Sequence, residues 1–281
     1  MLDLNSLVID GVPTLTHTVL FSVYPQAFFP NLCIHAVLVP GFSMGDTTNS
    51  GERFLANNKI EGTLEEQVES AIDFVKKNMS VKTSFNESAK RVDTPEYPLK
   101  AVREAVLNAV IHRDYSIHTE NQPIQVLMFK DRIEIKSPGG LFGRMKVKEL
   151  GSAKPDTRNP NIVKALEILG VTENRYSGIP TIKKEMQNYG LPQPKFIEDR
   201  GDFTTILFNA SHDQYAGLGI QEKILLFCRT PRKLDEISDF LNMASHQYIR
   251  NSFLNDLVDN GLLRLTIPNV KKSKHQQYVS I

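Results

Sequence analysis

The chain has 281 residues, 41% of them hydrophobic and 23% charged, so it can bury real cores and its length fits two domains of ordinary size. The formal net charge of +1 excludes a global attraction to nucleic acid, and any DNA binding must come from a local patch. The two cysteines, Cys33 and Cys228, lie far apart, which excludes a disulfide framework and a zinc ribbon and favours a reducing compartment.

The N-terminal part of the sequence predicts an α/β segment that does not enter a membrane. Residues 1–10 lack the basic region of a signal peptide, and the longest apolar stretch, 18–24, is too short to span a bilayer. We therefore expect a cytoplasmic protein with no membrane partner. Residues 14–24 and 32–39 predict strands, and a polar loop is predicted over 41–58.

The stretch REAVLNAVIHRDY, residues 103–115, predicts a helix with an unusual polar stripe. At helical spacing one broad face is apolar and consists of Val102, Ala105, Val106, Ala109 and Val110. Glu104, Asn108 and His112 follow one another at intervals of four residues and form a narrow polar line on a helix otherwise suited to a core.

The residue types in this stripe suit a nucleotide site. The carboxamide oxygen of Asn108 can ligate Mg²⁺ while phosphates and waters fill the other positions. The carboxylate of Glu104 can orient or deprotonate an attacking water, and His112 can line the same pocket. The alternative is that these groups only cap neighbouring backbone, and that Arg113 and Asp114 form a salt bridge or cap at the helix end.

Several further elements follow from local patterns. Thr63 and Glu66 have the spacing of a capping box, which predicts a helix beginning at Thr63. Residues 123–140 predict two strands joined by a tight turn, and a helix is predicted over 160–169. A further strand is predicted over 202–209.

Two glycine-containing turns can bring backbone N–H groups close to phosphate. The first contains Gly139 and Gly140, and the second, Ser177-Gly178, opens a helix whose N-terminus favours an anion. Between them lies a basic segment, 141–158, with Arg144, Lys146, Lys148, Lys154 and Arg158. It is either a lid that clamps phosphates or a solvated loop.

The C-terminal region predicts a winged helix after a linker at 211–219. Three helices (220–228, 232–241 and 244–260) precede a hairpin with a basic tip. Gln247 and Arg250 can read base edges, and the phosphate contacts are assigned to Lys271, Lys272 and Lys274.

Residues 214–281 contain nine Lys and Arg against six Asp and Glu, a mild excess that predicts weak, salt-sensitive binding by one copy. We therefore expect a homodimer on double-stranded DNA. The alternative is a winged helix that docks proteins.

Together these features resemble the GHKL (Bergerat) ATPase fold, in which Glu104, Asn108 and Ala109 match the Glu-x-x-x-Asn-Ala box. The more specific resemblance is to a divergent branch of that fold. It comprises bacterial Schlafen/Alba-like transcriptional regulators, also described as RecG-related, ATP-dependent DNA helicase-like proteins. Four segments agree in order and spacing over most of residues 15–281: YPLKAVREAVLNAVIHRDY, SPGGL, RNPNIVKALEILG and SGIPTIKKEMQNYGLPQPKF.

The resemblance implies an α+β protein, with a GHKL-like α/β sandwich (helices on one face of a mixed sheet) and a C-terminal winged helix. It implies ATP and Mg²⁺ as cofactors, with Glu104 as the catalytic residue of ATP hydrolysis and Asn108 as the Mg²⁺ ligand. The expected nucleotide contacts are Asn108, His112, Ser137, Gly139, Gly140, Arg158, Ser177 and Gly178. Two positions depart from the family pattern: Ser137 stands where the family has an adenine-binding Asp, and Tyr176-Ser177-Gly178 stands where its phosphate turn has Gly-x-Gly.

The expected division of the chain has four parts. Residues 1–92 form an N-terminal α/β segment, the tail of an Alba-like region; 93–210 form the divergent GHKL ATPase-like domain; 211–219 form the linker; and 220–281 form the winged helix. The expected function is a DNA-binding transcriptional regulator with an ATP-binding module. The alternatives are a RecG-related, DNA-stimulated ATPase and a nucleotide-free scaffold; a helicase motor is disfavoured because no Gly-x-x-x-x-Gly-Lys-Ser/Thr loop occurs.

Overall fold

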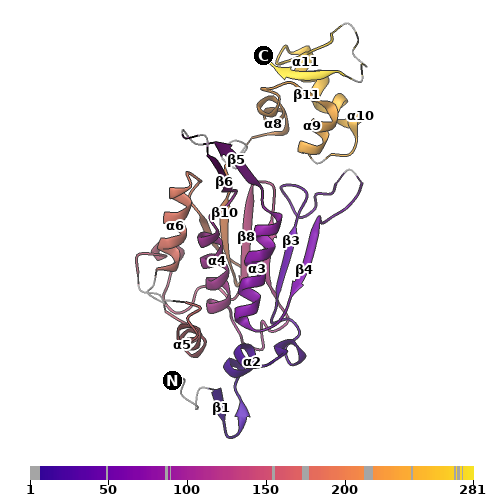
Figure 1. Ribbon diagram of the computed structural model, residues 1–281. Coiled ribbons are helices and arrows are strands. Elements are labelled where there is room, and N and C mark those ends of the chain that lie inside the picture. The colour runs from indigo at the N-terminus through magenta and orange to yellow at the C-terminus, as the bar shows by residue number, and fades with distance from the viewer. Residues whose placement is uncertain are drawn as a thin grey trace. The chain divides into compact units, whose positions relative to one another are not determined.

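The computed structural model describes residues 7–281 except 49, 86–87, 89, 154–155, 173–176, 212–217, 242, 269, 271–272 and 274 (Figure 1). The chain divides into two compact units. The first contains residues up to 38, 56–128 and 132–210, and the second contains 39–55, 129–131 and 211–281. The expected boundary at residue 92 falls inside the first unit.

The first unit is built on a six-stranded mixed sheet with the strand order β4-β3-β7-β8-β10-β9. The strands are β3 (Ile34–Leu38), β4 (Ala56–Ile60), β7 (Ile124–Met128), β8 (Arg132–Pro138), β9 (Lys195–Asp199) and β10 (Asp202–Phe208). Strands β3 and β7 are parallel, and the other neighbouring pairs are antiparallel. Residues before and after position 92 therefore contribute to one sheet.

Helices cover one face of this sheet, as Figure 1 shows for α3 and α4. The helices of the first unit are α2 (Leu15–Phe21), α3 (Leu64–Asn78), α4 (Leu99–His112), α5 (Pro160–Ile168) and α6 (Gly178–Asn188). Apolar side chains of all five helices pack with the inward residues of the strands into one core. The α+β architecture with a mixed sheet is confirmed.

Local chemistry explains where the two long helices begin and end. Thr63 caps α3 by accepting from Glu66 N at 3.3 Å, while the Glu66 carboxylate accepts from Thr63 N at 2.7 Å, so the capping box is confirmed. Helix α4 ends at His112, because the backbone of the next residue, Arg113, leaves the helical conformation (φ −50°, ψ 144°). The Arg113 side chain is only 1% exposed and donates to the carbonyls of Thr119 and Gln122, so its role is structural.

The strand expected over 14–24 is wrong, because helix α2 occupies most of it. Thr14 caps this helix, and Thr16, Val19 and Leu20 are buried at helical spacing. The β-branched residues of TLTHTVLF favour a strand locally, but burial of one helical stripe in the core overrides that preference.

Other elements had no clear local signal. Strand β4 begins inside the expected loop 41–58, and strand β9 was not expected. The remaining short elements of this unit are β1 (Val8–Ile9), β2 (Val12–Pro13), η1 (Pro25–Ala27), the hairpin β5 (Val81–Phe85) and β6 (Arg91–Pro95), and η2 (Val147–Glu149).

The second unit contains helices and a small antiparallel sheet in the order β11-β13-β12. Its elements are α8 (Ile220–Phe227), β11 (Arg232–Lys233), α9 (Leu234–Leu241), α10 (His246–Ile249), η3 (Arg250–Leu254), α11 (Asn255–Asp259), β12 (Leu263–Leu265) and β13 (Gln277–Ser280). Its core includes Ile224, Ile237 and Leu254. In the part of the chain that the structure describes, every helix is too short or too polar to cross a membrane.

Candidate functional site

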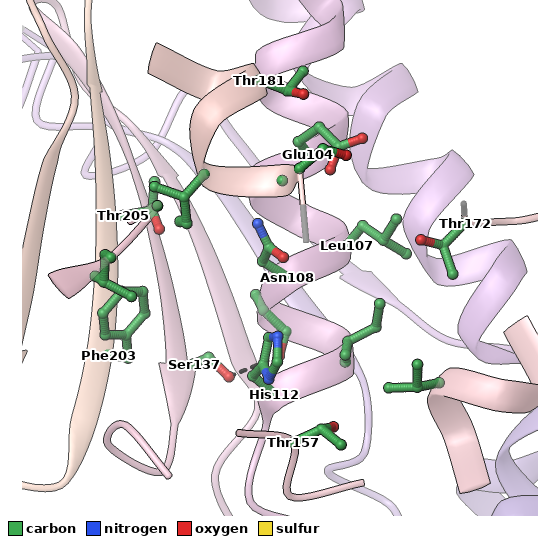
Figure 2. A pocket seen from close by; sticks show the side chains of 18 of the residues that line it. Glu104, Leu107, Asn108, His112, Ser137, Thr157, Thr172, Thr181, Phe203 and Thr205 are labelled. Carbon is green, nitrogen blue, oxygen red and sulfur yellow. Dashed lines mark hydrogen bonds between the residues drawn. The ribbon is translucent and has the colours of Figure 1, made fainter. Parts of the chain in front are cut away.

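The first unit contains a cavity of about 830 Å³ between α4, the adjoining ends of β8 and β10, the segment 139–157 and the start of α6 (Figure 2). This volume lies in the range of small-molecule sites. The cavity wall includes eight residues that the sequence singles out: Glu104, Asn108, His112, Ser137, Gly139, Gly140, Ser177 and Gly178. Their individual roles stay predictions.

Glu104 and Asn108 lie one turn apart on α4, and their side chains face the cavity. The Nδ2 atom of Asn108 is buried and has no hydrogen-bond partner among the described residues. A buried amide donor without a partner costs free energy, so this atom is a candidate donor to a bound group.

Gly178, the first residue of α6, closes over these two side chains. A Cβ atom at Gly178 would lie 2.9 Å from Asn108 Nδ2 and 3.2 Å from Glu104 Oε2. A larger residue would displace the amide or the carboxylate. The absence of a side chain therefore lets the backbone of the Ser177-Gly178 turn approach the polar stripe.

The N-terminus of α6 is suited to an anion. Ser177 occupies the N-cap position without a side-chain capping hydrogen bond, and the first turn contains no acidic residue. The first N–H groups of a helix lack intrahelical partners and lie at the positive end of its dipole. The turn thus supplies donors beside Asn108. Tyr176, the residue that departs from the Gly-x-Gly pattern, lies outside the described residues.

The Gly139-Gly140 turn has a packing explanation in addition to any ligand role. Gly139 has φ +96°, and a Cβ there would lie 2.6 Å from Asp114 Cβ and 2.9 Å from Asp114 N. Asp114 N donates to Pro138 O, and Gly139 N donates to Gly201 O, both at 2.8 Å. The turn is therefore pinned against the residues that follow α4.

Arg158 braces this turn from outside the cavity wall. Its guanidinium pairs with Asp114 at 2.7 Å, donates to Gly140 O at 3.1 Å and lies over the Phe142 ring. These contacts join the two ends of the segment 141–157, and they account for Asp114 as a structural ion pair. A direct contact between Arg158 and a nucleotide stays a prediction.

His112 is the third member of the polar stripe and also lines the cavity. Burial lowers the pKa of His112, and the nearby charge of Arg158 lowers it further. The imidazole is therefore neutral at pH 7, when it can both donate and accept a hydrogen bond.

The segment 141–157 faces the cavity with mostly apolar residues, including Phe142, Met145 and Leu150. Lys183 on α6 holds it by donating to Leu150 O at 3.1 Å. Three of its basic side chains, Arg144, Lys146 and Lys148, are exposed, and Lys154 lies outside the described residues.

The sequence does not predict two of the residues that line the cavity. Phe203 and Thr205 on β10 lie opposite Ser137 and Ile135 on β8 and share the cavity wall with them. The available signal is Thr205 itself, a polar residue at an inward position of the predicted strand 202–209. Its significance depends on strand pairing, which the local pattern does not give.

The candidate DNA-reading residues belong to the second unit. Ser245 caps α10 by accepting from Tyr248 N at 3.2 Å, so the helix begins close to its expected start. Gln247 is exposed and Arg250 is half-buried. The expected phosphate contacts Lys271, Lys272 and Lys274 lie outside the described residues.

Residues 121–207 match the model of a family described as "Putative ATP-dependent DNA helicase recG C-terminal". No curated protein matches the chain. The crystal structure of the DIP2311 protein from Corynebacterium diphtheriae is similar over 98% of this chain, with 19% sequence identity and a TM-score of 0.59, which indicates a shared fold. This chain spans 56% of that protein. Residues 121–207, from β7 to β10, are thus similar to a RecG-related, ATPase-like domain.

Proposed function

We propose that the first unit is a GHKL-like module that binds ATP with Mg²⁺, and that the second unit is a winged helix through which the protein binds DNA as a transcriptional regulator. The observation that carries the first part is the meeting of Asn108, Glu104 and the start of α6 in one cavity. The family match over residues 121–207 supports it.

The residues present fit a magnesium nucleotide. Mg²⁺ in nucleotide sites keeps several waters and takes phosphate oxygens together with few protein ligands. No group of three or more His, Cys, Asp or Glu that could hold a metal occurs among the described residues. In this mode the amide oxygen of Asn108 would be one of the few protein ligands, and its Nδ2, which has no partner among the described residues, would be a donor to a phosphate oxygen.

Each part of the proposed ATP chemistry is assigned to a different group of the site. Mg²⁺, when bound, neutralises phosphate charge and draws electrons from the transferring group. Glu104 orients a water and accepts its proton, and the N–H groups at the start of α6 stabilise the charge on phosphate. Arg158 keeps the Gly139-Gly140 turn in place beside this site.

The order of elements in the second unit supports the DNA-binding part of the proposal. Helices α8, α9 and α10–α11 precede the strands β12 and β13, and β11 completes the sheet, which is the order of a winged helix. The exposed Gln247 and the adjacent Arg250 would read base edges from the third helix. Lys271, Lys272 and Lys274 would contact phosphate, and a homodimer would raise the weak affinity of one copy.

Both cysteines, Cys33 and Cys228, are buried free thiols, which fits our proposal of a reducing, cytoplasmic setting.

Two assays on the full chain distinguish the proposed function from its two rivals. Calorimetric titration with ATP and Mg²⁺ should give saturable binding; a nucleotide-free scaffold gives none. If ATP binds, phosphate release is then measured with and without duplex DNA. DNA accelerates phosphate release by a DNA-stimulated ATPase, whereas it leaves the rate of a nucleotide-switched regulator unchanged.

A further inference from the structure

The segment 141–157 of the first unit has two sides of different chemistry. On one side, Met145 is among the apolar residues that line the cavity. On the other side lies an outer row of three basic residues, Arg144, Lys146 and Lys148, which are exposed and do not belong to the cavity wall. They alternate along the chain with Met145 and Val147, which are half-buried. The outer row is therefore available to a second ligand, outside the cavity.

The carboxylates nearest to the outer row bind backbone rather than basic side chains. Asp156 Oδ2 accepts a hydrogen bond from Arg144 N at 3.2 Å, and Glu149 Oε2 accepts one from Lys146 N at 3.1 Å. These bonds fix the chain that carries the outer row. Among the residues that the structure describes, none forms an ion pair with a side chain of the outer row. Three cations are thus presented to solvent from an anchored segment.

The local charge differs from that of the whole chain. Residues 141–158 contain five Lys and Arg against two Asp and Glu, although the formal net charge of the chain is only +1. Exposed cations of this kind attract a polyanion, and Lys and Arg can contact its phosphates whatever the base sequence. A membrane surface fits less well, because an interfacial segment also inserts apolar side chains, and Met145 and Val147 between the cations are half-buried. The observations therefore favour a nucleic acid backbone as the ligand.

We propose that the outer row binds the phosphodiester backbone of a nucleic acid, independently of base sequence and separately from the contacts proposed for the second unit. The site belongs to the first unit and requires neither a nucleotide nor Mg²⁺ in the cavity. Phosphates that the three cations contact release their counterions, so binding weakens as the salt concentration rises. Three such contacts contribute about 2.7 to the magnitude of the slope of log K against log salt on duplex DNA.

Two triple variants of the full chain test this site by fluorescence anisotropy with a duplex DNA of scrambled sequence and a duplex RNA of the same sequence. The test variant carries Arg144→Gln, Lys146→Gln and Lys148→Gln. It should bind at least one of the two duplexes about tenfold more weakly than the wild type at low salt, with a salt slope smaller by about two to three. The control variant removes the same charge from three other exposed lysines of the first unit, through Lys76→Gln, Lys77→Gln and Lys82→Gln. It should bind both duplexes within about twofold of the wild type.

The duplex that shows the larger loss identifies the nucleic acid. Wild-type affinity of the test variant for both duplexes, or equal losses in the test and control variants, would overturn the inference and leave the DNA contacts proposed for the second unit intact. If the wild type binds neither duplex at low salt, the inference fails together with the DNA-binding part of the proposed function. Vesicles that contain phosphatidylserine provide the last arm. A test variant that keeps duplex binding but loses vesicle binding would overturn the inference in favour of a membrane ligand.

Discussion

The cavity of the first unit and the helical face of the second unit carry their candidate functional residues in opposite ways. In the cavity, Asn108 and Glu104 are held by packing, and the Cα of Gly178 closes over them. In the second unit, the side chain of Gln247 is exposed to solvent. The comparison shows that short distances between packed side chains limit which groups a buried site can bind. Binding at an exposed site depends instead on charge and side-chain type, which many sequences can supply.

The largest effect on the cavity is expected from a substitution that fills the space at Gly178. In Gly178→Val, the new side chain overlaps the Asn108 amide and approaches the Glu104 carboxylate, so ATP binding should fall by at least about a hundredfold. Calorimetry with ATP and Mg²⁺ measures it. Gly45→Ala is the control, because its Cβ would meet nothing within 4 Å. Wild-type affinity in Gly178→Val would show that the ligand binds elsewhere.

A smaller effect is expected at the Gly139 turn, which tests whether packing also shapes the rim of the cavity. Gly139→Ala should lower the free energy of unfolding by about 2–4 kcal/mol, since it combines strain at positive φ with a clash against Asp114. Gly201→Ala has a similar φ of +83° and no neighbour within 4 Å, so it should cost only about 1 kcal/mol. Urea unfolding compares them; equal costs would remove the packing argument.

On the exposed side, Arg250→Ala should cost about 1–3 kcal/mol of binding to a preferred duplex and little on a scrambled one. Neutralising Lys271 and Lys272 should weaken binding to both duplexes alike and reduce the slope of log K against log salt by about two. Fluorescence anisotropy at several salt concentrations measures both effects. If the full chain binds neither duplex at low salt, the second unit is a protein-contact module.

The smallest effect concerns pH. Burial lowers the pKa of His112 in the folded protein below its unfolded value near 6.5. As pH falls through that unfolded value, the unfolded state takes up a proton that the folded state refuses, so stability decreases toward the lower, folded pKa. The free energy of unfolding of His112→Gln should therefore fall less than that of the wild type between pH 7 and pH 5. If the free energy of unfolding declines equally in both proteins, His112 is not a source of the pH dependence.

Much of the first unit can be predicted from local patterns, because its helices and inner strands bury periodic apolar faces. The capping box at Thr63 and the spacing of Glu104 and Asn108 are visible in the sequence, and both appear where expected. Helix α2 could not be predicted, since its threonines favour a strand until the core selects one helical stripe.

The remaining features of the site depend on contacts between distant residues. Gly178 lies 70 positions after Asn108, and only the packing of α6 on α4 shows that a side chain between them would clash. Thr205 joins the cavity through the pairing of β10 with β8. None of these relations has a local sequence signature.

The most direct test of the account is the melting temperature of the full chain with and without ATP and Mg²⁺. A ligand that binds only the folded state stabilises it by mass action, so millimolar ATP should raise the midpoint of the wild type. Asn108→Ala, which removes the proposed Mg²⁺ ligand, should abolish the rise, and Glu104→Gln, which removes only the base, should preserve it. An unchanged wild-type midpoint, or an equal rise in Asn108→Ala, would contradict a nucleotide site in this cavity.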